Sequence, residues 1–158
     1  MNIYLELTEQ FMTPTVLKLT GSLSAVFANA AWLFLAALGL WLLGRFVFKG
    51  SFTYLQTVEV TGLAMMVPIL GAIISMLLVI VTGNMYMTPG PALLLREFDA
   101  SSKVHQLLSA LNVMTIWYIF VLGIGLARLS GASLVKAAGW LFGVWAIVKT
   151  GAILLFIR

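Results

Sequence analysis

The chain has 158 residues, of which 62% are hydrophobic and only 9% are charged, with a formal net charge of +4. Soluble domains carry roughly 25% charged residues, so a soluble fold of this length could not hide its apolar surface and lipid must act as part of its solvent. The basic residues form no run, so anionic lipid headgroups are a better partner than nucleic acid. The sequence contains no Cys, which excludes disulfides and thiolate chemistry.

The N-terminal segment, residues 1–20, is predicted to be amphipathic and to lie at the membrane interface. Three of its apolar residues fall on one helical face, namely Ile3, Leu7 and Phe11. Thr13 and Pro14 then have the pattern of an N-cap followed by the first helical position. A new helix is therefore expected to begin there and to continue into the first span.

Four uncharged stretches follow, and each can supply the ~20 residues needed to cross ~30 Å of hydrocarbon. They predict spans at about residues 23–46, 60–82, 107–128 and 136–157. Backbone groups in lipid must bond within their own segment, and the alternating polarity of barrel strands is missing, so these spans are helices. The sequence thus predicts an all-α fold: a polytopic transmembrane bundle of four spans plus an interfacial N-terminal helix, forming one membrane domain.

Within these spans two residues depart from a simple apolar helix. Pro68 is expected to kink the second span, because it lacks a backbone N–H. Lys149 interrupts the fourth span, and a central Lys costs about 2.5 to 3.5 kcal/mol. Ten Leu, Ile, Val and Phe residues between Leu141 and Ile157 return roughly 3 to 6 kcal/mol, so insertion is still favoured.

The basic residues suggest an orientation. The connections 45–59 and 128–136 are short and hold four Lys and Arg residues, whereas the opposite side spreads four over about twice the length. This density favours the short connections as cytoplasmic.

Four polar residues are expected at one depth of the bundle, and they form the first candidate site: Asn29, Ser75, Asn112 and Lys149. Polar side chains at one level can hydrogen-bond across helices, so the group could form a polar step for conduction. The alternative interpretation is a structural clamp, with Lys149 extending to the membrane surface.

A stripe of small residues on the fourth span forms the second candidate site: Gly139, Gly143, Ala146 and Thr150. Small residues allow helix backbones to approach closely. The stripe could bind a partner or a second copy, or it could pack inside the chain's own bundle.

Catalytic and cofactor motifs are missing from the sequence. His105 is the only histidine, so a His-based metal site is not expected, and no glycine-rich phosphate loop occurs. We therefore predict no catalytic residues, no cofactor and no metal.

Three segments carry a resemblance to a known family. Residues 109–131 (SALNVMTIWYIFVLGIGLARLSG), residues 50–70 and the start of the fourth span at 136–140 (KAAGW) resemble the Yip family, bacterial relatives of the Ypt/Rab-interacting membrane proteins. The resemblance implies a protein of the bacterial cytoplasmic (inner) membrane. Members typically have five spans, so it also implies that the first span is missing here and that residues 1–22 correspond to the loop that follows it.

The resemblance favours a non-enzymatic scaffold or accessory subunit, which acts through helix–helix contacts with other membrane proteins. A transporter complex or a second copy of the chain would be such a partner. The alternative is a small permease or channel with a polar step around Lys149.

Overall fold

Helices make up all the regular structure in the part of the chain that the computed structural model describes, which is residues 13–85, 87–95, 99 and 102–156. This confirms the predicted all-α fold. Residues 1–12, most of the predicted interfacial segment, lie outside that part. The elements are α2 (Pro14–Phe46), α3 (Tyr54–Ala64), α4 (Met66–Thr82), the 3-10 turn η1 (Pro91–Leu94), α5 (Lys103–Ala110), α6 (Val113–Ser130) and α7 (Leu134–Phe156).

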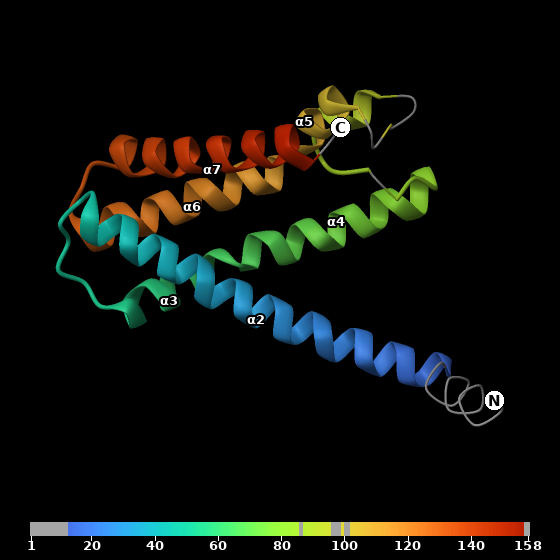
Figure 1. Cartoon of the computed structure of the whole chain (residues 1–158), viewed down its shortest axis with the longest axis horizontal. Helices are drawn as coiled ribbons and strands as arrows, with labels where there is room; N and C mark the ends of the chain where they lie inside the picture. The colour runs from blue at the N-terminus through green and yellow to red at the C-terminus, as the bar shows by residue number, and fades with distance from the viewer. Residues whose placement is uncertain (1–12, 86, 96–98, 100–101, 157–158) are drawn as a thin grey trace.

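Among the described residues, four helical segments are long and apolar enough to cross a membrane, in agreement with the predicted number: Thr15–Phe46, Tyr54–Thr82, Val113–Ser130 and Leu134–Leu155. They alternate in direction, as Figure 1 shows. The two short connections, 47–53 and 131–133, lie at one end of the bundle. Helix α5, η1 and the end of α7 lie at the other end.

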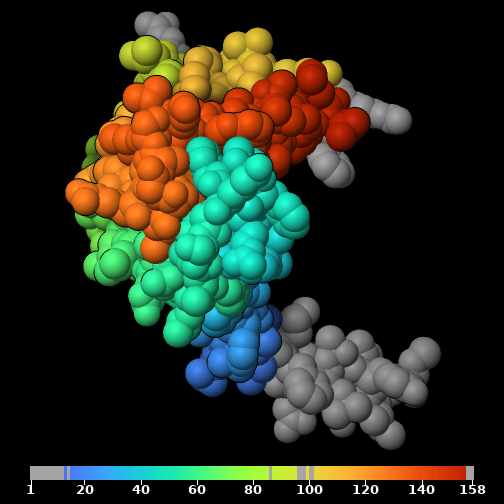
Figure 2. Space-filling view, turned by 90° about the vertical axis from the view of Figure 1, so that its left-hand side faces the viewer, coloured from blue at the N-terminus to red at the C-terminus, as the bar shows by residue number. Residues whose placement is uncertain are grey.

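The first span is longer than a bilayer requires. Helix α2 begins at Pro14, with Thr13 as the N-cap and Pro in the first turn, as the sequence predicts. Its 33 residues extend about 50 Å at 1.5 Å per residue. The C-terminal part packs against α3 and α6, whereas residues 17–32 are exposed throughout. Figure 2 shows this N-terminal part of α2 protruding from the packed body of the molecule.

The second span is interrupted next to the proline that predicts a kink. Helix α3 ends at Ala64, and α4 begins at Met66, two residues before Pro68. Because Pro68 has no N–H to donate to the carbonyl of Ala64, the regular ladder cannot continue through this point. Met65 nevertheless keeps right-handed helical geometry, with φ of −64° and ψ of −13°, so the two helices remain parts of one span.

The third apolar stretch is not one helix, which differs from the span expected at residues 107–128. Helix α5 ends at Ala110, Leu111 leaves helical geometry, and α6 begins only after Asn112. The loop before α5 explains the break: Val113 donates its N–H to the Pro89 carbonyl at 2.9 Å. A Cβ at Gly90 would lie only 2.7 Å from the Leu111 carbonyl oxygen, so the loop approaches this closely because residue 90 is glycine.

Helix α6 is the centre of the bundle, since it contacts α7, α3, α4 and α2. The buried core lies toward the end with the two short connections: Leu40, Phe52, Ala64, Leu122, Leu126 and Ala137. Gly123 of α6 faces α7 so closely that a Cβ there would lie 3.1 Å from both Cα and Cβ of Ala138. Small residues thus set the distance between these two helices.

Candidate functional site

The structure brings two of the four predicted polar residues to one cavity. Ser75 of α4 and Asn112, directly before α6, both line a cavity of about 260 Å³ between these helices. Thr115 and Tyr118 of α6 line the same cavity. The cavity thus collects hydroxyl and amide groups and no charged side chain from the described residues.

Asn112 also has a structural role, because it caps α6. Its side-chain oxygen accepts a hydrogen bond from the Met114 N–H at 2.8 Å. An Asn at this position satisfies one of the backbone donors that a helix start leaves unpaired. Asn112 therefore marks the beginning of a helix, rather than a point several residues inside one.

Asn29 lies beside a different cavity. It lines a groove of about 600 Å³ between α2 and α4, together with Trp32 and Met65. Its side-chain amide donates to the Ala25 carbonyl of its own helix at 2.7 Å. Pro68 and Ala72 line both this groove and the Ser75 cavity, so the two spaces lie against the same segment of α4.

Lys149 stands apart from the other three residues. It is exposed on α7 and lines neither of these two cavities. The expected single polar layer is thus divided in the structure: Ser75 and Asn112 share a cavity, Asn29 borders the neighbouring groove, and Lys149 lies elsewhere.

Thr115 and Tyr118 were not among the predicted site residues. They follow the N-cap Asn112 at intervals of three, which places Thr115 and Tyr118 on one side of α6, in line with its N-cap. That spacing was visible in the sequence. The Tyr118 hydroxyl is buried and has no hydrogen-bond partner among the described residues, which the sequence alone could not reveal.

The small-residue stripe of α7 is open on the surface. Gly139, Gly143, Ala146 and Thr150 are all exposed. A Cβ built on Gly139 or Gly143 would meet no atom within 4 Å, in contrast to the buried Gly123. The stripe therefore does not mediate packing inside the described part of the chain.

His105 stabilises the turn that precedes α5. Its Nδ1 accepts a hydrogen bond from the Asp99 backbone N–H at 3.0 Å, just before α5. Among the described residues, no group of three or more His, Asp or Glu side chains could hold a metal ion. This arrangement gives His105 a role in ordering the connection.

The chain was compared with models of known protein families. The family model described as the Yip1 domain matches residues 2–156, nearly the whole chain. The comparisons found no curated protein and no solved structure that matches it.

Asn112 and Asn29 provide a matched pair of substitutions. We expect Asn112→Ala to lower the free energy of unfolding by about 1 kcal/mol, because α6 loses its N-cap. Asn29→Ala should leave it almost unchanged, because that amide bonds only within its own exposed helix. Unfolding in mixed detergent micelles measures both, and equal losses for the two variants would contradict the capping role.

Proposed function

The chain belongs to the Yip1 domain family, and we propose that it is a non-enzymatic scaffold or accessory subunit that binds other membrane proteins. The open stripe on α7 is the observation that carries this proposal. Its two glycines offer a surface to which another helix can approach closely.

The shape around the stripe supports a helix as its partner. Trp140 and Ile147, which border the small residues along α7, are 51% and 74% exposed. Small residues between larger ones form a shallow groove in which the ridge of a second helix can pack. Helix association in lipid depends on such close packing, since lipid tails are as apolar as the side chains.

The basic residues support an orientation in the membrane. Arg45, Lys49, Arg128 and Lys136 all lie at or beside the two short connections. We propose that this end is cytoplasmic in a bacterial inner membrane. The partner that we propose is a transporter complex, whose assembly or regulation the chain would assist.

Crosslinking at Gly143 tests the proposed surface directly. The chain has no Cys, so Gly143→Cys provides a single reactive position. Labelled there with a thiol-reactive photocrosslinker, the chain should form an adduct with a second membrane polypeptide when native membranes are irradiated, as read from gels and mass spectrometry.

Gly39→Cys is the matched control, since Gly39 is also exposed on a spanning helix with no atom within 4 Å of a built Cβ. No adduct at Gly143, or equal yields at both positions, would contradict the proposed surface. An adduct of twice the chain's mass would instead identify a second copy.

A small permease is the second candidate function, and the cavity lined by Ser75 and Asn112 favours it. Its hydroxyl and amide groups could replace part of the hydration shell of a polar solute. The exposed position of Lys149 outside that cavity weakens the version built around this lysine.

A flux assay separates the two functions. We expect vesicles that contain the native protein to pass no more ions than protein-free vesicles. Flux that Ser75→Ala lowers and Lys18→Ala preserves would contradict the scaffold proposal and support a permease built on that cavity.

A further inference from the structure

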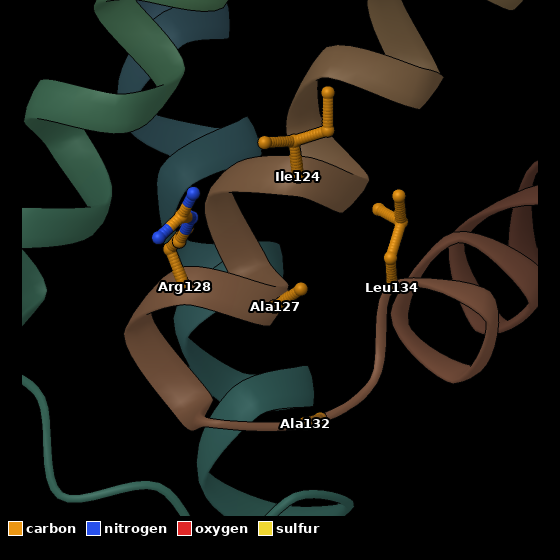
Figure 3. Close-up of a pocket in the computed structure, with 5 residues that line it drawn as sticks. All are labelled: Ile124, Ala127, Arg128, Ala132 and Leu134. Carbon is orange, nitrogen blue, oxygen red and sulfur yellow. The ribbon is translucent and has the colours of Figure 1, made fainter.

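A pocket lies where α6 ends and α7 begins. Its volume is about 380 Å³, and Figure 3 shows its lining residues: Ile124, Ala127, Arg128, Ala132 and Leu134. Gly131, with φ of 70°, reverses the chain between the two helices, which brings the start of α7 to the side of α6. The pocket thus lies at the same end as the two short connections.

The pocket combines one cationic side chain with apolar ones. Arg128 lies in the last turn of α6, and Ile124 lies one turn deeper, about 6 Å along the helix. Apart from Arg128, every lining side chain is apolar. One cationic group therefore lies beside an apolar wall, of which Ile124 is the deepest part.

The charge of Arg128 is not neutralised by a neighbouring carboxylate in the described part of the chain. Arg128 is exposed, and no carboxylate of the described residues lies within 4.0 Å of it. Arg45, at the same end of the bundle, instead lies over the Trp41 ring, 5.9 Å from its centre. The two arginines therefore differ in what they face, although both are exposed.

We propose that this pocket binds an anionic phospholipid of the adjacent leaflet. The Arg128 guanidinium holds the phosphate, for which its planar set of donors is well suited. The glycerol and the first acyl carbons contact Ile124, Ala127 and Leu134. The charge and the apolar wall beside it match the two parts of a lipid, whereas a free phosphate would use only the charge.

Lipid titration of the full-length protein tests this assignment. Native mass spectrometry in detergent, with dioleoylphosphatidylglycerol as the probe and dioleoylphosphatidylcholine as the zwitterionic reference, should show preferential binding of the anionic lipid. We expect Arg128→Gln to weaken phosphatidylglycerol binding about fivefold. Arg128→Lys should recover only part of it, because the charge is kept but the planar set of donors is lost.

Two further variants separate the site from general electrostatics. Arg45→Gln removes an equal charge at the same end and should leave binding unchanged. Ile124→Trp keeps every charge but fills the pocket, and it should weaken binding.

Three results would overturn the proposal: equal losses in Arg128→Gln and Arg45→Gln, equal binding of the two lipids, or full competition by inorganic phosphate. Unchanged binding in Ile124→Trp would also exclude the pocket as the lipid site. Each folded variant is compared at matched thermal stability, so a loss of fold is not read as a loss of binding.

Discussion

Close approach of α6 to its neighbours is the constraint on which the rest of the bundle depends. Lipid tails are as apolar as leucine, so burial of apolar surface gives little drive for one spanning helix to leave lipid for another. The association of spanning helices therefore depends on dense van der Waals contact between them, which small residues permit. Gly123 against Ala138 sets the approach of α7, and the fully buried Ala64 and Ala137 belong to the core that packs with Leu122 and Leu126 of α6.

The exposed glycines of α7 have the same small size, but no helix of the described part of the chain packs against them. Gly139 and Gly143 face away from the other described helices, whereas Gly123 faces one directly. Within the described residues, small residues of α6 thus pack against a neighbouring helix, whereas the small residues of the α7 stripe are exposed. The scaffold proposal depends on this difference, while the lipid pocket at Arg128 depends on the charge at the end of α6 and stands independently.

Spans and helix starts could be predicted from the sequence because they follow from local chemistry. Continuous apolar stretches and the Thr13-Pro14 pattern depend on neighbouring residues alone, and the break beside Pro68 follows from a missing donor. The break at Asn112 could not be predicted in this way, because it depends on the distant loop at Pro89 and Gly90. Lys149 was predicted to lie at the same depth as Ser75, but it does not line the Ser75 cavity. Depth along a helix does not determine which face of the helix a side chain occupies.

The most direct measurement compares the unfolding free energies of Gly123→Leu and Gly139→Leu in mixed micelles. We expect a loss of about 1–3 kcal/mol for Gly123→Leu, because the larger side chain forces α6 and α7 apart. The change for Gly139→Leu should stay within about 0.5 kcal/mol, because a side chain there meets open space. Equal destabilisation by both substitutions would contradict the division between an internal and an available surface.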